Sequence, residues 1–280
     1  MFRRKDVLSE WERIFSARGL DSPRLSAQVL LAHILRLDRL ALLLDLNVPV
    51  QESDLTKFQV LAKRREAGEP VAYLTGHKEF YGLDLLVTPD VLIPRPETEL
   101  LIDFVRNYCV SRQNCSILDI GTGSGAVAIA CASCLPSARV VGVDISNAAL
   151  KIAKINAMRH GLQGKIDFVL GDLVQPLQLS SFRVLLANLP YVPLKSYRNL
   201  SPEVRNFEPH LALFAGMDGL DCYNRLAAMI NVGVDSGTEL FCEIDPSQKN
   251  AVQKLFGLKA RQIDVLKDFS GLERFVHVVF

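Results

Sequence analysis

Residues 117–125 read Ile-Leu-Asp-Ile-Gly-Thr-Gly-Ser-Gly, and this stretch decides the fold. A short apolar run ends in a turn with glycine at every second position, where the backbone can take a positive φ and approach a ligand closely. The apolar segment 126–135 predicts a helix that points its N-terminus at that ligand. Asp144 ends the next apolar run, 19 residues after Gly125, where an acid can accept hydrogen bonds from ribose hydroxyls. We therefore expect a nucleoside site at the end of a parallel strand.

Strand-like and helix-like segments alternate around this stretch. Strands are predicted at 116–120, 139–143, 165–170, 183–187 and 238–244, with two more at the C-terminus. Helices are predicted at 98–110, 126–135, 147–159, 220–230 and 247–255. This alternation predicts an α/β fold, a mostly parallel sheet with helices on both faces.

The first 90 residues have a different pattern. Residues 1–70 favour helices: Pro23 suits a first helical position, and apolar residues recur at helical spacing from Leu25 to Leu37. We interpret 1–70 as a small helical domain that docks the substrate. Aromatic and β-branched residues punctuated by glycine predict a β-hairpin linker over 71–90, with Val71 to Leu74 in its first strand. The sheet domain then occupies 91–280.

The composition is that of an ordinary globular chain. The 280 residues are 49% hydrophobic and 22% charged, and 32 Lys and Arg against 31 Asp and Glu leave a formal net charge of +1. These values exclude disordered chains and disulfide scaffolds and disfavour a strongly basic nucleic-acid binder. No run approaches the ~20 apolar residues of a membrane-spanning helix, and the basic start is not followed by the apolar core of a secretion signal. Six scattered cysteines predict free thiols, no metal site and a cytoplasmic protein.

A second motif, Asn188-Leu189-Pro190-Tyr191, follows the strand predicted at 183–187. An NH₂ group conjugated to an sp² carbon is a poor nucleophile, so a site must hold it in line with a methyl donor, about 3 Å away. The side-chain oxygen of Asn188 and the main-chain carbonyl of Leu189 can each accept one N–H of that group. Pro190 stiffens the loop, and Tyr191 offers an aromatic face. A simple turn is the alternative for these four residues.

The glycine turn by itself leaves two chemistries open. Gly121, Gly123 and Ala126 also satisfy the dinucleotide pattern G-x-G-x-x-G/A, which would indicate a nicotinamide-linked oxidoreductase. That alternative leaves the motif at 188–191 unexplained. The acid Asp119 before the turn and the third glycine, Gly125, resemble class I methyltransferases instead.

The resemblance to class I methyltransferases implies S-adenosyl-L-methionine as cofactor and S-adenosyl-L-homocysteine as product. It also implies the residues that bind the cofactor, namely Gly121, Thr122, Gly123, Ser124, Gly125, Asp144, Asp172, Leu173 and Asn188.

Three further segments resemble the PrmC/HemK family, the protein-glutamine methyltransferases of peptide-chain release factors. They are Tyr-Leu-Thr-Gly-His-Lys-Glu-Phe-Tyr-Gly at 73–82, Leu-Ile-Pro-Arg-Pro-Glu-Thr-Glu at 92–99, and the stretch from Glu208 to Leu220. The resemblance implies methylation of the side-chain amide of the glutamine in the Gly-Gly-Gln motif of bacterial release factors. The catalytic and substrate-binding residues would then be Asn188, Leu189, Pro190 and Tyr191. We expect a monomer that binds a release factor, with no metal, no membrane and no direct nucleic-acid contact.

The chain departs from that family at three places. The family usually has Asn-Pro-Pro-Tyr, where Leu189 stands here in the second position. Because Asn-Leu-Pro-Tyr also resembles ribosomal RNA adenine dimethylases, an adenine methyltransferase acting on rRNA or DNA stays as the alternative. Arg183 replaces an acid in the preceding strand, and Glu243-Ile244-Asp245 stands where the family favours Glu-Ile-Gly.

Three other groups have a structural interpretation. Cys131 and Cys134 have redox spacing but fall inside a predicted helix. The run 63–65, Lys-Arg-Arg, is typical of a solvent-exposed helix end. Arg95 and Glu97 could shape a substrate entrance, form an ion pair or cap a helix.

Overall fold

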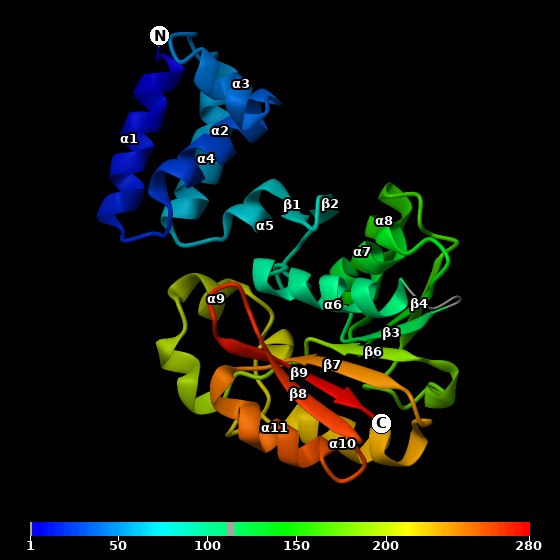
Figure 1. The fold of residues 1–280 in the computed structure, drawn as a ribbon. Helices are drawn as coiled ribbons and strands as arrows, with labels where there is room; N and C mark the ends of the chain where they lie inside the picture. The colour runs from blue at the N-terminus through cyan, green and yellow to red at the C-terminus, as the bar shows by residue number, and fades with distance from the viewer. Residues whose placement is uncertain (1, 111–114) are drawn as a thin grey trace. The chain divides into compact units, whose positions relative to one another are not determined.

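The structure is a computed structural model and describes residues 2–110 and 115–280 (Figure 1). The chain divides into two compact units. We call the first the helical unit (Met1–His77 with Ser201–Phe207) and the second the sheet unit (Lys78–Leu200 with Glu208–Phe280). The sequence analysis placed no part of 91–280 with the helices, so the return of the chain to the helical unit at 201–207 is a feature of the tertiary structure.

The helical unit packs around one cluster of large apolar side chains. Its helices are α1 (Arg4–Ala17), α2 (Pro23–Leu35), α3 (Arg39–Leu44), α4 (Glu52–Glu66), α5 (Val71–Thr75) and α9 (Pro202–Phe207). Phe15 and Phe58 are fully buried, and Trp11 meets the edge of Phe58 with ring centroids 5.9 Å apart. Helices α1, α2 and α4 therefore share a common core.

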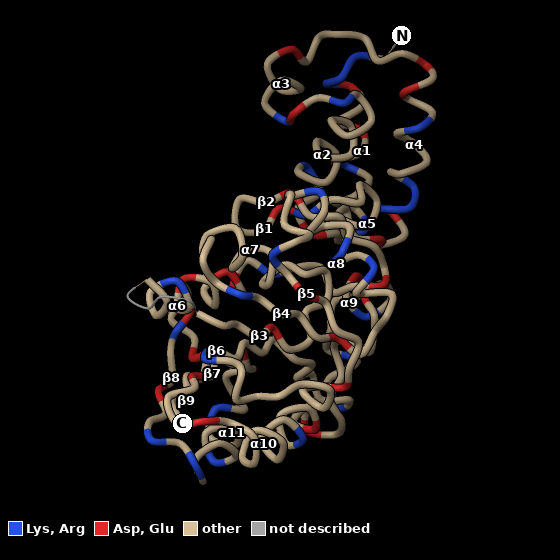
Figure 2. Tube along the Cα trace, turned by 90° about the vertical axis from the view of Figure 1, so that its right-hand side faces the viewer, with Lys and Arg blue, Asp and Glu red and all other residues tan. Residues whose placement is uncertain are grey.

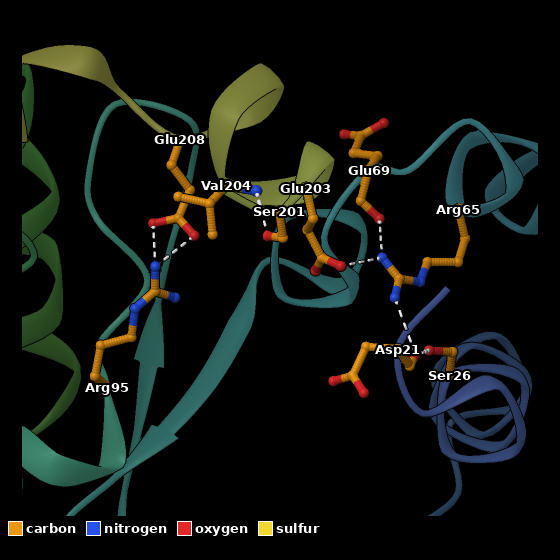
Figure 3. Close-up of polar contacts among 9 residues, drawn as sticks. All are labelled: Asp21, Ser26, Arg65, Glu69, Arg95, Ser201, Glu203, Val204 and Glu208. Carbon is orange, nitrogen blue, oxygen red and sulfur yellow. Dashed lines mark hydrogen bonds and ion pairs between the residues drawn. The ribbon is translucent and has the colours of Figure 1, made fainter. Parts of the chain in front are cut away.

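Arg65, near the end of α4, is buried inside this unit with only 2% of its surface exposed. Its guanidinium donates to the carboxylate of Glu203 at 2.8 Å and to the main-chain carbonyls of Glu69 at 3.1 Å and Asp21 at 3.2 Å (Figure 3). The prediction of a solvent-exposed helix end is therefore wrong for Arg65, although Lys63 and Arg64 are exposed. The sequence could not indicate this, because Glu203 lies 138 residues away.

The hairpin predicted over 71–90 forms, but it begins later than expected. Val71–Thr75 is the helix α5 and not a strand, because the Pro70 carbonyl accepts from the amides of Tyr73 and Leu74 and starts a helical turn. Gly76 ends that turn with φ +74°. The hairpin strands are β1 (His77–Phe80) and β2 (Leu83–Leu86).

The sheet unit contains a seven-stranded sheet in the order β5-β4-β3-β6-β7-β9-β8. The strands are β3 (Ser116–Ile120), β4 (Arg139–Asp144), β5 (Ile166–Leu170), β6 (Val184–Ala187), β7 (Glu239–Glu243), β8 (Gln262–Lys267) and β9 (Glu273–Val279). The first five are parallel, and β9 pairs antiparallel with β7 and with β8. The chain leaves β3 toward β4 on one side and later fills β6 on the other, so the strand order reverses beside β3. Such sheets bind ligands at that reversal, at the carboxyl ends of the strands.

Helices cover both faces of the sheet (Figure 1). One face packs α6 (Glu99–Cys109), α7 (Ala126–Cys134) and α8 (Asn147–Arg159), and the other packs α10 (Asp221–Gly233) and α11 (Lys249–Phe256). Short 3₁₀ helices occupy Pro96–Thr98, Leu179–Ser181, Leu194–Asn199, His210–Ala212 and Pro246–Gln248. Neighbouring strand residues point to opposite cores: Ile117 joins the first cluster and Leu118 the second. The α/β fold predicted from the alternation of segments is confirmed.

The cysteines of the sheet unit are not all free thiols. Cys109, at the end of α6, and Cys115, just before β3, are joined by a disulfide, so the prediction of six free thiols is wrong for this pair. Cys131 and Cys134 stay free inside α7, and burial raises the pKa of the Cys131 thiol.

Basic and acidic residues are interspersed along the chain (Figure 2). Over residues 2–110 and 115–280, no helix combines the length and apolarity that a membrane crossing requires.

Candidate active site

The glycine turn after β3 is tied to the neighbouring strand. The amides of Gly121 and Thr122 both donate to the Val143 carbonyl, at 2.8 and 3.0 Å. Gly121 and Gly123 have φ of +75° and +56°, which side chains rarely adopt. A Cβ on Gly123 would meet only the Gly121 carbonyl, at 3.9 Å, so glycine leaves the space beside this turn open.

Asp144, at the end of β4, is held by two main-chain amides. One carboxylate oxygen accepts from Gly123 and the other from Ser146, each at 2.8 Å. Burial raises the pKa of this acid, and the amide hydrogen bonds oppose the rise. Each oxygen has further acceptor capacity, so the carboxylate can still bind a pair of hydroxyl groups.

Asp119, near the end of β3, ties the turn to α7. One of its oxygens accepts from the Thr122 hydroxyl at 2.6 Å and from the Ala128 amide at 3.1 Å, in the first turn of that helix. Burial raises the pKa of Asp119 to about 6, against these two hydrogen bonds. The acid before the turn is therefore a buried anchor of the loop.

We expect Asp119→Asn to change how stability depends on pH. Asp119 binds a proton more tightly in the folded chain than in the unfolded one, so its contribution to the free energy of unfolding falls as pH rises from about 4 to about 6. Asparagine keeps an oxygen for both hydrogen bonds and has no charge. Between pH 4 and pH 7 the free energy of unfolding of the variant should therefore rise by about 2 kcal/mol relative to that of the parent. Urea unfolding at pH 4 and pH 7 measures this, and an equal difference between variant and parent at both values would contradict it.

Asp172 and Leu173 follow β5 at the same edge of the sheet. Asp172 forms an ion pair with Arg225 of α10, a partner that the sequence did not predict. Leu173 has φ +53°, unusual for a residue with a side chain.

The motif Asn188–Tyr191 lies directly beyond β6 and is held from several sides. The Asn188 side-chain NH₂ donates to the Thr98 hydroxyl at 3.1 Å, and the main-chain carbonyl of Tyr191 accepts from the Gln248 side chain at 2.9 Å. The Tyr191 hydroxyl donates to Glu243 at 3.4 Å. Burial, and to a smaller extent the negative charge of Glu243, raise the pKa of the phenol. Leu189 is buried with 4% exposure.

Thr98 and Glu243 join the motif from elsewhere in the chain. The Thr98 hydroxyl donates to a carboxylate oxygen of Glu243 at 2.6 Å, and both residues are buried. Burial raises the pKa of Glu243, and the hydrogen bond from Thr98 and the charge of Arg274 oppose the rise. Both residues fall within segments that the sequence analysis quoted, but no sequence signal paired them with Asn188.

One cavity of about 380 Å³ connects these groups. Most of the predicted site residues line it: Gly121, Thr122, Gly123, Ser124, Asp144, Asp172, Leu173, Asn188, Leu189 and Pro190. Of the described residues, Gly125 and Tyr191 were also predicted but are not in the lining; Gly125 precedes the first residue of α7. Thr98 and Arg225 line the cavity without having been predicted as site residues. Arg95, which the sequence analysis gave as one that could shape a substrate entrance, lines it as well.

Arg95 is fixed at the cavity wall by an ion pair. Its guanidinium nitrogen lies 2.7 and 2.8 Å from the two carboxylate oxygens of Glu208, whose side chain is 1% exposed (Figure 3). Of the three interpretations given for Arg95, the structure contains the ion pair, and Arg95 also lines the cavity.

Comparison with known proteins agrees with this architecture. Residues 6–76 match the model of the PrmC N-terminal domain, and residues 111–252 match a methyltransferase domain. Two solved structures share the fold at low sequence identity. They are a methyltransferase from Pyrococcus furiosus (TM-score 0.53, 16% identity, 79% of this chain and 96% of that one) and the N-terminal domain of human METTL16 in complex with SAH (TM-score 0.52, 13% identity, 84% and 85%).

Curated relatives cover almost the whole chain. The release factor glutamine methyltransferase of Moorella thermoacetica is 40% identical over 272 residues, 96% of each chain. That of Chlorobaculum tepidum is 37% identical over 278 residues, 96% of this chain and 94% of the relative. Identity at this level over both units shows common descent of the whole chain and not of one domain. The chain belongs to the release factor glutamine methyltransferase family.

Proposed function

We propose that this protein transfers a methyl group from S-adenosyl-L-methionine to the side-chain amide nitrogen of the glutamine in the Gly-Gly-Gln motif of peptide-chain release factors. The observation that carries the proposal is the Asn188 side chain: it lines the same cavity as the glycine turn, and its NH₂ is already bound to Thr98. Its oxygen is thereby left as an acceptor for a substrate N–H.

The cavity fits this cofactor. The open space beside Gly123 and the paired acceptors of Asp144 suit a nucleoside that carries a ribose diol. In this proposal the turn 121–125 holds the methionine part, Asp144 the ribose, and Asp172 with Leu173 the adenine. When bound, S-adenosyl-L-methionine supplies an electrophilic methyl on a positively charged sulfur.

The residues after β6 orient the nucleophile. Asn188 Oδ1 and the Leu189 carbonyl each accept one N–H of the glutamine amide. Two acceptors on one NH₂ weaken its conjugation with the carbonyl and stabilise the positive charge that develops on nitrogen. Pro190 limits the loop to few conformations. Tyr191 anchors it through the contact of its hydroxyl with Glu243 and the hydrogen bond that its main-chain carbonyl accepts from Gln248. The donor sulfur is already cationic, so no strong general base is needed for the transfer itself.

We expect Asp144→Ala to weaken cofactor binding by roughly ten- to a hundredfold, because charge-assisted hydrogen bonds contribute on the order of 1.5–3 kcal/mol. Titration calorimetry with S-adenosyl-L-homocysteine measures the change in dissociation constant. Asp167→Ala is the matched control, since that acid is exposed on β5 and forms a long, exposed ion pair with Arg139 at 3.8 Å. Equal affinity of the Asp144 variant and the control would contradict the assignment.

The partner and the setting follow from this function. We propose that the helical unit docks the release factor, that the protein acts as a monomer in the cytoplasm, and that it makes no direct contact with nucleic acid. Exposed apolar side chains of α3, Leu40 and Leu44, support a docking role for the helical unit. The net charge of +1 supports a protein substrate over a nucleic acid.

The test uses the full chain, methyl-labelled S-adenosyl-L-methionine and an intact release factor, with mass spectrometry to map the label. Methylation of the Gly-Gly-Gln glutamine is the expected result, and it should be far slower on a short Gly-Gly-Gln peptide, which offers the helical unit little to dock. Label found instead on adenine of ribosomal RNA or DNA would favour the alternative that Leu189 raises.

A further inference from the structure

We propose that Thr98 and Glu243 are positioning residues that hold the Asn188 amide in one orientation, with its oxygen toward the substrate. The proposal rests on the function above, because it assigns the orientation that a glutamine NH₂ requires. It concerns three side chains from three separate segments: the 3₁₀ helix before α6, the end of β6 and the end of β7.

The sheet register brings these segments together. β6 and β7 pair in parallel with Leu186 opposite Phe241 and Ala187 opposite Cys242. Continuing that register places Asn188 opposite Glu243. Asn188 and Glu243 lie two residues after Leu186 and Phe241, which belong to the core on the α6 side of the sheet. Since side chains two residues apart in a strand point to the same face, both face the α6 side. The segment that leads into α6 covers this end of the sheet and supplies the Thr98 hydroxyl to both.

Hydrogen-bond capacity decides the orientation. A threonine hydroxyl has one proton and two lone pairs. The Thr98 proton is donated to Glu243 at 2.6 Å, so toward Asn188 the hydroxyl can only accept. Only the NH₂ end of the Asn188 amide can donate, at 3.1 Å. Turning the amide round would set two acceptor oxygens against each other inside the protein.

Burial makes that selection strict. Thr98 is 4% exposed and Glu243 2%, so water has little access to repair a mismatched pair. The second oxygen of Glu243 faces the Tyr191 hydroxyl at 3.4 Å, which keeps the carboxylate oriented from the other side. Hydrogen-bond donation therefore runs in one direction, from the Asn188 NH₂ to the Thr98 hydroxyl and from that hydroxyl to the Glu243 carboxylate.

The orientation of the Asn188 amide decides whether its oxygen or its NH₂ faces the substrate NH₂. With the NH₂ bound to Thr98, Asn188 Oδ1 is available to accept an N–H from the substrate amide. A reversed Asn188 would present its own NH₂ to the substrate NH₂, donor against donor. Losing the Thr98 hydroxyl should thus lower the rate of transfer and leave cofactor affinity unchanged.

The first measurement needs neither cofactor nor substrate. With asparagine labelled by ¹⁵N, the side-chain NH₂ resonance of Asn188 is identified by its loss in Asn188→Ala, and its proton exchange with solvent is followed. Thr98→Val keeps the side-chain shape but removes the acceptor, so exchange of this NH₂ should accelerate by about tenfold or more, in line with the loss of one buried hydrogen bond. Thr98→Ser restores the hydroxyl and should restore slow exchange.

The second measurement is single-turnover methylation of a release factor at saturating cofactor. Thr98→Val should be slower by about ten- to a hundredfold, with the dissociation constant of S-adenosyl-L-homocysteine changed less than about twofold. Glu243→Gln retains an oxygen that can accept from Thr98 and should stay close to the parent, whereas Glu243→Leu should resemble Thr98→Val. The matched control is Thr238→Val, a buried threonine whose hydroxyl donates to the Phe182 carbonyl at 3.3 Å.

The outcomes separate this proposal from the proposed function. Unchanged NH₂ exchange in a folded Thr98→Val chain overturns the positioning role, whatever the chain methylates. An equal rate loss in Thr98→Val and Thr238→Val also overturns it, because both would then report only a lost buried hydroxyl. Fast exchange in Thr98→Val, reversed in Thr98→Ser, supports the role even if the release factor is not the substrate.

Discussion

Replacing Asn188 by alanine should slow methylation of a release factor by about 10²–10³-fold, because loss of one preorganised contact at a reacting group typically raises the barrier by roughly 2.7–4 kcal/mol. The side chain lines the cavity and its NH₂ donates to Thr98, so the alanine variant loses the oxygen that we propose as the acceptor for the substrate N–H. Cofactor affinity should fall much less, since the turn 121–125 and Asp144 remain. Single-turnover kinetics at saturating cofactor is the measurement.

Two companion variants show whether the effect is specific. Asn188→Asp would be tolerated if the residue only shaped a turn, since aspartate favours the same backbone conformations. In this structure it should also be slow, because an aspartate oxygen would face the Thr98 oxygen whose proton already goes to Glu243. Asn224→Ala, an exposed asparagine of α10, should match the parent. A rate for Asn188→Ala within about threefold of the parent, far short of a transition-state contact, would remove the proposed mechanism.

Gly219→Ala should lower the free energy of unfolding by about 3 kcal/mol. Gly219 has φ +81°, which costs a residue with a side chain roughly 1–2 kcal/mol. A Cβ there would also overlap the main-chain carbonyl of Tyr191 and the Gln248 amide, and overpacking of this kind typically adds about 1–3 kcal/mol. Because the Tyr191 carbonyl belongs to the loop that follows β6, the transfer rate should fall as well.

Gly237→Ala is the matched control for the backbone term. Its φ is +88°, but a Cβ there would meet nothing within 4 Å. We expect it to lose only the roughly 1–2 kcal/mol of the positive φ and to keep full activity. Urea unfolding of both variants tests this, and equal losses of stability would show that close packing of Gly219 against Tyr191 is unimportant.

The local signals in the sequence were sufficient for most elements of the sheet unit. The strand 116–120 was predicted with the bounds of β3, and the helix 147–159 with those of α8. Each is a short apolar or periodic segment with clear ends; the Ser146 side chain, for example, accepts from the Ala149 amide and starts α8. The segment 71–74 was predicted as a strand because of its β-branched and aromatic residues. It is a helix because hydrogen bonds to Pro70 and burial of Tyr73 and Leu74 outweigh that weak preference.

Some residues of the candidate site could be predicted from the sequence, and others could not. The glycine turn, Asp144 and the motif 188–191 directly follow the parallel strands β3, β4 and β6, so their types and positions predicted one edge of the sheet. Thr98 lies 90 residues from Asn188 and 145 from Glu243, and Arg225 lies 53 from Asp172. No spacing rule joins positions so far apart, because their proximity depends on strand order and register.

The sequence by itself therefore determined the α/β alternation and the positions of the glycine turn and of the motif 188–191. These depend on backbone preferences and residue types within single strand-loop-helix segments. Only the tertiary structure decided the burial of Arg65 against Glu203, the disulfide of Cys109 and Cys115, and the direction in which the Asn188 amide points. The ion pair and the amide orientation need partners from distant segments that only packing brings together, and the hydrogen-bond capacity of buried partners then favours one arrangement. The disulfide joins cysteines six residues apart, at the end of α6 and just before β3.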